Sequence, residues 1–300
     1  MKQQIGLIGV GLMGHGIARN LLKHGYPLTV VEHPGNQPLD ELLRGGVRTV
    51  KTPRELASEA DVVILCVTGS PEVEAVLTGE QGVLAGLKDN AIVVDCSTAV
   101  PDSTVRMARL VEAAGGRLVD APMTRGAKEA HEGRLNLLVG ATPGLFDEIR
   151  PVLACFAENI TRVGELGAGH SMKLLHNFVS LGTIALLSEA VACAKRSGVD
   201  TAVLAEVLAN GGGGGVALNR LRPFLASGDT SSLPFHMANA FKDLSYYSAM
   251  AADNDAAHAI ASAVTHTYRD AVASAGAHCP VLKLSDVLVA TDAPEEGEAR

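Results

Sequence analysis

The 300-residue sequence lacks the basic segments that would direct a protein to nucleic acid or to a membrane surface. Acidic residues outnumber Lys and Arg, 33 to 25, and no run of basic residues occurs. Proteins that bind nucleic acids or anionic lipids do so through clustered Lys and Arg. The formal net charge of −8 therefore argues against both as the main partner.

Cysteine is scarce, and its spacing is not that of a structural framework. The five cysteines are odd in number and no two lie close together in the sequence: Cys66, Cys96, Cys155, Cys193 and Cys279. This spacing favours neither a disulfide framework nor a zinc site, and we expect no metal. Unpaired thiols fit a reducing cytoplasm, which is the expected location.

The sequence predicts neither a signal peptide nor a repeated pattern of membrane spans. Lys2 is the only charged residue before the first apolar segment, and glycines interrupt that segment, so we expect a strand and a turn there. Residues 178–194 form an apolar run of 17 residues with one ionisable group, Glu189. This run is at the short limit for a bilayer and has no second run of similar length. We therefore expect a buried helix and no membrane partner.

The composition is that of a globular chain with a large core. Hydrophobic residues make up 47% and charged residues 19%, and the chain is too long for one typical domain. We expect a dinucleotide-binding domain over 1–165, a long helix over 166–196 and an all-helical domain over 197–300. The acidic tail 290–300 has few apolar residues to anchor it and is expected to fray. The further helices are expected over 201–209, 218–226, 235–251, 257–275 and 282–288.

The N-terminal segment carries the pattern G-x-G-x-x-G between a predicted strand and a predicted helix. Gly9 permits the tight turn, Gly11 lets a pyrophosphate approach the backbone, and Gly14 lets helix and strand pack closely. A helix is expected to begin near Met13, so Leu12 and Met13 lie at its N-terminus, where free N–H groups and the positive end of the helix dipole face phosphates. This context predicts a dinucleotide site.

Glu32 ends the next predicted strand, LTVVE, 18 residues beyond Gly14. A Rossmann unit places at this point the carboxylate that accepts hydrogen bonds from the adenosine ribose hydroxyls. A 2′-phosphate would meet like charge, and His33 and Pro34 follow in place of an arginine. We therefore expect NAD as the cofactor. The alternative is a solvated glutamate at the end of a strand.

Strands and helices alternate through the rest of the first half. Strands are expected near 47–50, over 60–67 and over 90–98, with helices between them, which predicts an α/β, Rossmann-type, doubly wound parallel sheet. Cofactors bind at the carboxyl ends of such strands, which places Val67 and Thr68 beside the dinucleotide. Thr98 offers a hydroxyl at the same edge. It could equally cap the helix that begins near Pro101.

The stretch from Gly169 to Ser197 reads as one long helix with apolar residues on nearly every side, which predicts packing all around it. His170, Lys173 and Asn177 recur at the spacing that puts side chains on one face of a helix. One face of this apolar helix therefore carries polar side chains near its start. The alternative for the lysine is a side chain that extends along the apolar surface to reach water.

Five motifs follow one another in order along the chain: GVGLMGHGIARNLLKHG at 9–25, DCSTAVP at 95–101, DAPMTRGAKEAHEGRLNLLVGA at 120–141, GAGHSMKLLHN at 167–177 and FKDL at 241–244. Together they resemble the β-hydroxyacid dehydrogenase family, which includes 3-hydroxyisobutyrate dehydrogenase and tartronate semialdehyde reductase. The resemblance covers nearly the whole chain and implies hydride transfer between NAD and a short 3-hydroxy acid or its semialdehyde, in a homodimer or homotetramer.

The resemblance also implies roles for particular residues. Lys173 matches the catalytic lysine, which exchanges a proton with the substrate hydroxyl. Asn177 matches the asparagine that orients substrate and lysine. Lys242 is expected to approach the nicotinamide, and Asp243 to steady the lysine and the substrate. The alternative for Lys242 and Asp243 is an exposed ion pair on an amphipathic helix.

One departure from the family pattern bears on the substrate. Where the family usually has Ser-Gly-Gly, this chain has Thr124, Arg125 and Gly126. Thr124 keeps a hydroxyl for the substrate carboxylate, while Arg125 adds a charged fork suited to a second anionic group. We therefore expect a small anionic substrate with a second or bulkier anion. Alternatively, Arg125 points to solvent or pairs with Glu129 or Asp147.

Two smaller departures concern His176 and the glycine run 211–215. His176 stands where many members have an asparagine, and a buried imidazole there is more often a satisfied core group than a second base. The glycine run is expected either to close over the substrate or to form a long turn.

Two other functions remain open on the same scaffold. An imine reductase is one, although relatives of that kind generally lack the lysine that Lys173 supplies here. A non-catalytic NAD-binding sensor is the other. It would not need Lys173, Asn177 and a hydroxyl at Thr124 together.

Overall fold

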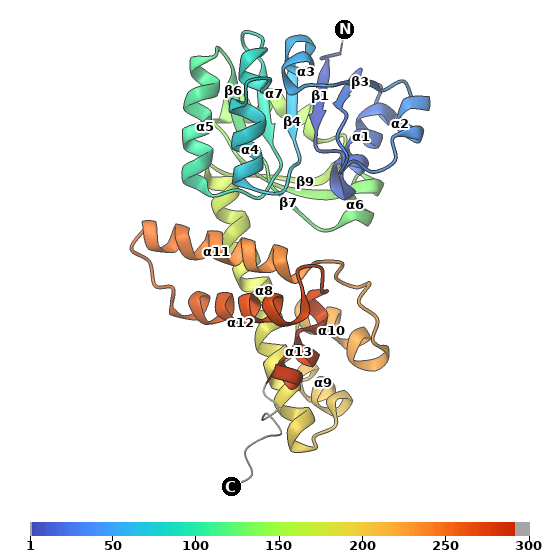
Figure 1. Cartoon of the computed structure of the whole chain (residues 1–300), viewed down its shortest axis with the longest axis vertical. Coiled ribbons are helices and arrows are strands. Elements are labelled where there is room, and N and C mark those ends of the chain that lie inside the picture. Colours follow the sequence, from blue (N-terminus) through green and yellow to red (C-terminus); the bar gives the residue numbers. More distant parts are fainter. Residues whose placement is uncertain (1, 292–300) are drawn as a thin grey trace. The chain divides into compact units, whose positions relative to one another are not determined.

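The structure is a computed structural model that describes residues 2–291, and the chain divides into two compact units, Met1–Lys173 and Leu174–Arg300. The division falls inside the long helix α8, Ala168–Ser197, which Figure 1 shows in yellow-green. Its first turns belong to the N-terminal unit and the rest to the C-terminal unit. The predicted fraying of the acidic tail concerns residues that lie almost entirely outside the described ones.

The N-terminal unit is built on a nine-stranded sheet, of which six strands run parallel in the order β3-β2-β1-β4-β5-β6. Chain order reverses between β1 and β4, as in a doubly wound fold. The predicted Rossmann-type architecture is therefore confirmed. The strands are β1 Ile5–Ile8, β2 Leu28–Val31, β3 Arg48–Val50, β4 Val62–Leu65, β5 Ile92–Asp95, β6 Arg117–Asp120, β7 Met123–Thr124, β8 Leu135–Gly140 and β9 Ala157–Gly164.

Alternate residues of each central strand enter two separate cores, one on each face of the sheet. Val62 and Ile64 of β4 join the core under α1 and α7, whereas Val63 and Leu65 join the core under α3, α4 and α5. Helices on both faces explain why β4 is apolar at every position. The helices of this unit are α1 Leu12–Lys23, α2 Asp40–Arg44, α3 Pro53–Glu59, α4 Ser70–Thr78, the 3₁₀ turn η1 Val83–Ala85, α5 Pro101–Ala113, α6 Ala127–Glu132 and α7 Pro143–Leu153.

The far edge of the sheet departs from the parallel arrangement of the other strands. Strand β8 runs antiparallel to β6 and to β7, and β9 then runs parallel to β8. After β6 the chain forms the short strand β7 and the six-residue helix α6, which packs against α1. No crossover helix covers the sheet at this point, and without one a following strand returns antiparallel.

The C-terminal unit is helical throughout its described residues, as predicted, apart from an isolated bridge between His236 and Pro280. Its core gathers apolar residues of α8, α10, α11 and α12 around the buried Tyr268, whose hydroxyl donates to the carbonyl of Leu181 (3.2 Å). The glycine run forms a turn before α10. The helices are α9 Thr201–Ala209, α10 Val216–Ser227, α11 Met237–Asp253, α12 Ala259–Ala275, the 3₁₀ turn η2 Val281–Lys283 and α13 Leu284–Thr291.

Helix α8 is apolar on two opposite faces, but the chain buries only one of them. Leu181 and Ile184 are buried, whereas Leu175, Val179 and Leu186 are 44%, 66% and 65% exposed. The exposed residues recur at spacings of four and seven, so they form one stripe. The prediction of packing on all sides was therefore wrong within one chain. Among residues 2–291, α8 is the one helix long and apolar enough to cross a membrane, and 56% of its most apolar window is buried, as in a core helix.

Candidate active site

The three glycines of the N-terminal pattern each have the geometry predicted for them. Gly9 has φ of +95°, and a Cβ there would lie 2.3 Å from the carbonyl oxygen of Cys66. A Cβ on Gly14 would lie 2.0 Å from the carbonyl oxygen of Gly9. A Cβ on Gly11, by contrast, would meet no atom within 4 Å. Two glycines thus close the turn onto the strand, and the middle one leaves the backbone open on its outer side.

Helix α1 begins at Leu12 with Gly11 as its N-cap, and no side chain caps it. Its first-turn N–H groups therefore have no capping side chain and point beyond the helix end. A methyl group at Gly11 would project into open space. This open cradle fits the pyrophosphate of a dinucleotide.

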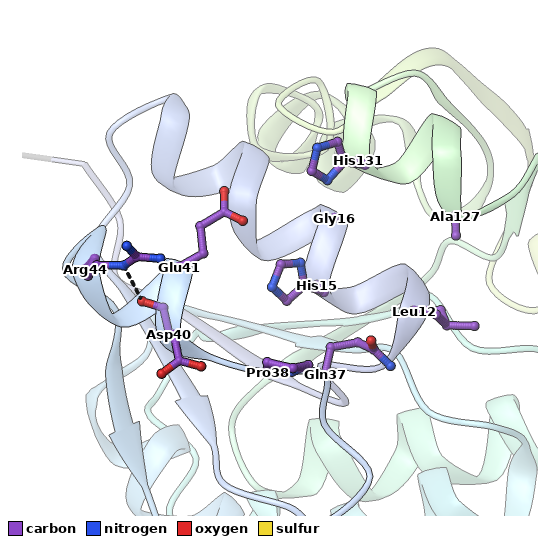
Figure 2. Close-up of a pocket in the computed structure, with 10 residues that line it drawn as sticks. All are labelled: Leu12, His15, Gly16, Gln37, Pro38, Asp40, Glu41, Arg44, Ala127 and His131. Carbon is purple, nitrogen blue, oxygen red and sulfur yellow. Dashed lines mark hydrogen bonds between the residues drawn. The ribbon is translucent and has the colours of Figure 1, made fainter.

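A cavity of about 490 Å³ starts at the same helix end and continues along the outer side of α1. Figure 2 shows Leu12 and His15 of α1 along its floor, with Gln37 on one side and His131 of α6 on the other. None of the residues predicted to bind substrate lines this cavity. It extends from the N-terminal end of α1.

Glu32 follows β2 directly, and its carboxylate is held by two neighbours from the adjacent strand. Thr49 donates a hydrogen bond to Oε1 (2.8 Å), and the Lys51 ammonium forms an ion pair with Oε2. These hydrogen bonds, that of Lys51 first, lower the pKa of Glu32 below its ordinary value. Glu32 is therefore a charged carboxylate at the edge of the sheet, as predicted, but it already has a cationic partner.

The loops after β4 and β5 are joined at the carboxyl edge of the sheet. Val67 donates its backbone N–H to the Ser97 hydroxyl (3.1 Å), and Val100 donates its own to the Ser70 hydroxyl (2.8 Å). Val67 lies just past the end of β4, so the predicted strand over 60–67 is shorter in the structure. Helix α5 has Val100 as its N-cap and no side-chain cap, so Thr98 does not cap it.

A buried polar network that sequence reasoning missed anchors the start of α8. Asp120, at the end of β6, accepts backbone hydrogen bonds from Gly167 and His170, each 2.8 Å. The His170 imidazole is fully buried and lies 2.7 Å from the Thr104 hydroxyl, with Asp95 and Asp120 each 3.8 Å away. Burial raises the pKa of Asp120. The network fixes the turn that precedes Lys173.

His170 therefore leaves the polar stripe that the helical spacing predicted, because its side chain turns into the N-terminal core. Lys173 is half-buried and Asn177 is buried, one helical turn apart on α8. His176 is exposed, which corrects the expectation of a buried imidazole, and its Nδ1 lies 3.0 Å from Asn177 Oδ1. No simple sequence signal separates an inward histidine from an outward one on an apolar helix.

Asn177 donates from Nδ2 to Oδ2 of Asp243 on α11 (2.6 Å). The Lys242 ammonium lies 3.0 Å from the other oxygen of Asp243 and 5.2 Å from the centre of the Tyr246 ring. The Asp243 side chain is only 3% exposed. Lys242 and Asp243 are therefore not the exposed ion pair that was the alternative, because the carboxylate is buried and bonded to Asn177.

Thr124 and Gly126 lie on β7 and at the N-cap of α6. The Thr124 hydroxyl is buried and accepts from the Asn136 amide (3.1 Å). A hydroxyl that accepts one hydrogen bond can still donate another. The backbone N–H of Gly126 donates to the Glu129 side chain (3.0 Å), which closes the helix end. Glu129 therefore competes with any substrate for that N–H.

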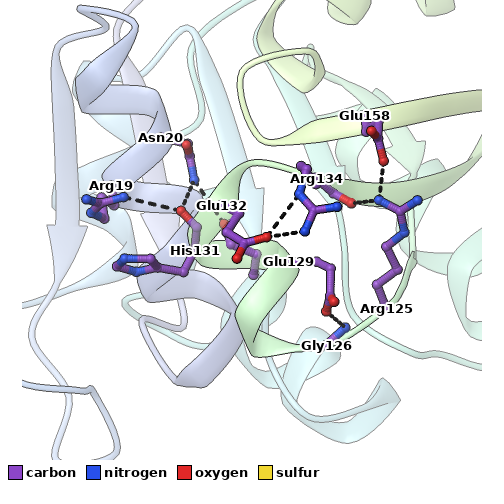
Figure 3. A network of polar contacts seen from close by, with 10 residues as sticks. Arg19, Asn20, Arg125, Gly126, Glu129, His131, Glu132, Arg134 and Glu158 are labelled. Carbon is purple, nitrogen blue, oxygen red and sulfur yellow. Dashed lines mark hydrogen bonds and ion pairs between the residues drawn. The ribbon is translucent and has the colours of Figure 1, made fainter.

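Arg125 adopts a left-handed backbone conformation, with φ of +76°, which glycine tolerates best. The usual family glycine at this position suits that conformation. Its guanidinium pairs with Glu158 and donates to the carbonyl of Arg134, as Figure 3 shows. The alternative partners Glu129 and Asp147 were therefore wrong, and the acid that meets Arg125 lies on β9.

Among residues 2–291, no three His, Cys, Asp or Glu side chains are grouped as metal ligands would be. The five cysteines are free thiols. The candidate polar groups are those of Thr124 and Lys173 in the N-terminal unit and of Asn177 and Asp243 in the C-terminal unit, together with backbone N–H groups. Such groups orient an anion and move a proton.

Two family models match the chain. Residues 4–164 match the NAD-binding domain of 6-phosphogluconate dehydrogenase, and residues 167–284 match the NAD-binding domain of NADP-dependent 3-hydroxyisobutyrate dehydrogenase. The glycine cradle lies within the first match and α8 within the second. The chain therefore uses a nicotinamide dinucleotide, NAD or NADP.

Individual relatives agree with these models. The chain is 31% identical to 2-(hydroxymethyl)glutarate dehydrogenase of Eubacterium barkeri over 80% of each chain. It is 34% identical to 2-hydroxy-3-oxopropionate reductase of Escherichia coli K12 over 69% of this chain and 70% of that one.

Solved structures give the same result. Mycobacterium tuberculosis 3-hydroxyisobutyrate dehydrogenase with L-serine superimposes with a TM-score of 0.85 at 25% identity over 96% of this chain and 99% of that one. Psf3 in complex with NADP+ and 2-OPP gives 0.79 at 26% identity over 95% and 99%. With motifs, fold and relatives in agreement over nearly its whole length, the chain belongs to the β-hydroxyacid dehydrogenase family.

Proposed function

We propose that the protein is a dehydrogenase that oxidises a short 3-hydroxy acid, or reduces the corresponding semialdehyde, with Lys173 as its general acid and base. The observation that carries the proposal is the buried hydrogen bond between Asn177 and Asp243, four residues after Lys173 on the same helix. A buried, charge-assisted bond of this kind holds an amide in one orientation. Core packing alone does not require it.

The glycine cradle and the N-terminus of α1 would hold the pyrophosphate, and Glu32 the adenosine ribose. The bound nicotinamide supplies the hydride acceptor or donor. Since Glu32 offers a carboxylate to two ribose hydroxyls and like charge to a 2′-phosphate, we propose that NAD is the preferred form.

Lys173 would take the proton of the substrate hydroxyl at Nζ during oxidation and return it to the oxygen during reduction. The network around His170 holds the preceding turn of α8 in place. Lys173 itself is half-buried, which limits the rotamers open to it. The network around His170 and the partial burial of Lys173 favour a lysine that is held in position for proton transfer. They argue against a side chain that only extends to solvent.

The substrate is proposed to be a small anion. The Thr124 hydroxyl would donate to its carboxylate, and Arg125 would meet a second anionic group. The relative from Eubacterium barkeri is named for a dicarboxylate, which is consistent with such a group. Glu158 and the carbonyl of Arg134 compete with the substrate for the same guanidinium.

We further propose that the chain works as a homodimer or homotetramer in the cytoplasm, without nucleic acid or membrane partners. The apolar stripe of α8 that the chain leaves exposed supports assembly, because such surface is unfavourable in water. The acidic net charge supports the absence of a polyanionic partner. Some relatives are named as mitochondrial enzymes, so location varies among proteins of this kind.

The test is turnover of NAD with 3-hydroxyisobutyrate, 2-(hydroxymethyl)glutarate and, in the reverse direction with NADH, 2-hydroxy-3-oxopropionate. We expect turnover of at least one, and a loss of about 100-fold to 10,000-fold in kcat for Lys173→Ala, the range usual for a proton-transferring side chain. NADH affinity, titrated by its own fluorescence, should stay within a factor of about three, since Lys173 acts on the substrate.

Lys173→Arg is the matched control, because it keeps the positive charge but cannot act as a base. Its kcat should fall as far as that of Lys173→Ala. Unchanged turnover in Lys173→Ala would contradict the proposed role of Lys173 as general acid and base. Tight NADH binding with no turnover of any hydroxy acid would favour the non-catalytic sensor.

A further inference from the structure

Lys51, the residue after strand β3, forms an ion pair with Glu32, the predicted ribose-binding residue. Strands β2 and β3 pair in parallel with Val31 opposite Val50, so the residues that follow them, Glu32 and Lys51, emerge side by side at the carboxyl edge of the sheet. The backbone N–H of Glu32 donates to the carbonyl of Val50 (2.9 Å), which fixes this register up to the last residue.

Strand β3 and the residue after it supply partners to both oxygens of the Glu32 carboxylate. The Lys51 ammonium pairs with Oε2, and the Thr49 hydroxyl donates to Oε1 (2.8 Å). The Lys51 backbone is itself anchored, because its N–H donates to the Glu55 side chain (3.0 Å) in the capping box of α3. The ammonium is therefore held beside the carboxylate by ordered backbone on both strands.

We propose that Lys51 is a specificity-determining residue for the dinucleotide, one that lets the site accept a 2′-phosphate as well as a free ribose. The inference rests on the proposed function, since it takes Glu32 to be the ribose-binding residue. The inference adds that NAD is preferred over NADP by a modest factor only. The Glu32 carboxylate should repel the 2′-phosphate of NADP, but the Lys51 ammonium offsets that repulsion.

Lys51 would affect the choice of nucleotide because its positive charge lies beside the negative charge of Glu32. A lone carboxylate repels a phosphate dianion and accepts hydrogen bonds from two ribose hydroxyls. An ammonium in contact with that carboxylate offsets the repulsion and offers its own N–H groups to the phosphate. Lys51 can swing from Glu32 to a phosphate, since its side chain is 77% exposed. With a free ribose it stays on Glu32.

A purely structural role does not account for this lysine. Ion pairs between exposed side chains add little to stability, and Glu32 is itself 40% exposed. The adjoining α3 has its own capping box, so it does not depend on the lysine side chain. Lys51 can therefore be replaced without loss of the fold, and the consequences should appear in ligand selection.

The experiment measures the dissociation constants of NADH and NADPH by their own fluorescence. Lys51→Met keeps an unbranched side chain that is one atom shorter and removes the charge. We expect it to raise the ratio of the NADPH to the NADH dissociation constant by about tenfold or more, mainly through weaker NADPH binding.

Lys51→Arg is the matched control, and its ratio should stay within about threefold of the wild-type ratio because the charge remains. Glu32→Gln should bind NADPH more tightly than the wild type does. The effect of Lys51→Met on NADPH should shrink as salt concentration rises, since the pair is exposed.

A ratio that Lys51→Met leaves unchanged within twofold overturns the inference, even when both nucleotides bind and hydroxy acids turn over. Failure of all variants to bind either nucleotide overturns it together with the assignment of Glu32. Tight binding without turnover of any hydroxy acid defeats the proposed enzyme alone, because the binding ratios are measured without substrate. The two failures are therefore distinguishable.

Discussion

The side-chain amide of Asn177 donates a 2.6 Å hydrogen bond to the carboxylate of Asp243, which lies 66 residues further along the chain. Both residues are buried, with exposures of 6% and 3%. A buried amide that loses its acceptor destabilises the folded protein, because no hydrogen bond then offsets the desolvation of the amide. The bond therefore ties the orientation of Asn177, on α8, to α11.

Asp243→Ala should lower kcat/KM by about 10-fold to 100-fold, since it leaves the Asn177 amide unpaired at a cost of about 1–3 kcal/mol. Asp243→Asn should lose less, because its carbonyl can still accept the bond. Steady-state kinetics with the best substrate of the panel measures both. In a double-mutant cycle, Asn177→Ala should add little once Asp243 is alanine. Additive losses would mean that the two residues act separately.

Gly11→Ala and Gly14→Ala should separate ligand binding from folding. A Cβ on Gly11 meets no atom within 4 Å, so the stability of Gly11→Ala should change by less than about 1 kcal/mol. Its NADH affinity should fall by about tenfold or more, because the methyl group enters the pyrophosphate space. Gly14→Ala should instead lose about 1–3 kcal/mol of stability, since its Cβ would lie 2.0 Å from the Gly9 carbonyl.

Urea unfolding and NADH titration measure these two effects independently. If Gly11→Ala bound NADH as tightly as the wild type, the pyrophosphate could not lie over that glycine. A Gly14→Ala protein of unchanged stability would show that the loop can shift away from the helix.

Arg125→Gly should leave stability within about 1 kcal/mol of the wild type. It relieves a left-handed backbone conformation that costs about 1–2 kcal/mol in non-glycine residues, and it loses a partly exposed ion pair worth about 0–1 kcal/mol. If Arg125 meets a second anion, KM for 2-(hydroxymethyl)glutarate should rise about tenfold more than KM for 3-hydroxyisobutyrate. Equal effects on the two substrates would remove Arg125 from substrate recognition.

Glu158→Gln is the matched variant for Arg125, because it weakens the pair and keeps the guanidinium. It should lower KM for the dicarboxylate by a few-fold, since Glu158 no longer competes with the substrate for Arg125. A rise in KM would indicate that Glu158 instead holds Arg125 in the position that the substrate needs.

The exposed stripe of α8 should be an interface between copies of this chain. Leu186→Lys places a charge at a position that is 65% exposed, so it should leave the monomer folded and shift the assembly to smaller species. Analytical ultracentrifugation measures the shift. The exposed Glu206→Lys, which lies on a different helix, α9, changes the charge by two units and is the control. A wild-type chain that sediments as a monomer would contradict this assignment.

Cys66 should resist alkylation at neutral pH although it follows strand β4 near the glycine cradle. Burial, with a smaller effect of Asp95, raises the pKa of this thiol to about 12. At pH 8 about one molecule in 10,000 then carries the reactive thiolate, and that fraction rises about tenfold per pH unit up to the pKa. Mass spectrometry after iodoacetamide treatment should find Cys66 unmodified at pH 8 in native protein and modified in urea. Rapid native labelling at pH 8 would show an exposed thiolate.

The local features of the site were predictable because they depend on spacing along the chain. The glycine pattern, the carboxylate at Glu32 and the one-turn separation of Lys173 and Asn177 follow from strand and helix periodicity. The outline of the fold was predictable for the same reason, since alternating strands and helices make a doubly wound sheet. The antiparallel edge was not, because the two-residue strand β7 and the six-residue helix α6 have no distinct pattern.

The partners of those residues depend on contacts between distant segments, and no spacing encodes them. Tertiary packing decided that His170 turns inward to Asp120, that Asp243 holds Asn177, and that Lys51 meets Glu32 across two strands. It also decided that one apolar face of α8 stays exposed, although both faces carry large apolar residues. Hydrophobicity shows that a side chain favours burial, but only the packed chain determines which neighbour, or which second copy, can bury it.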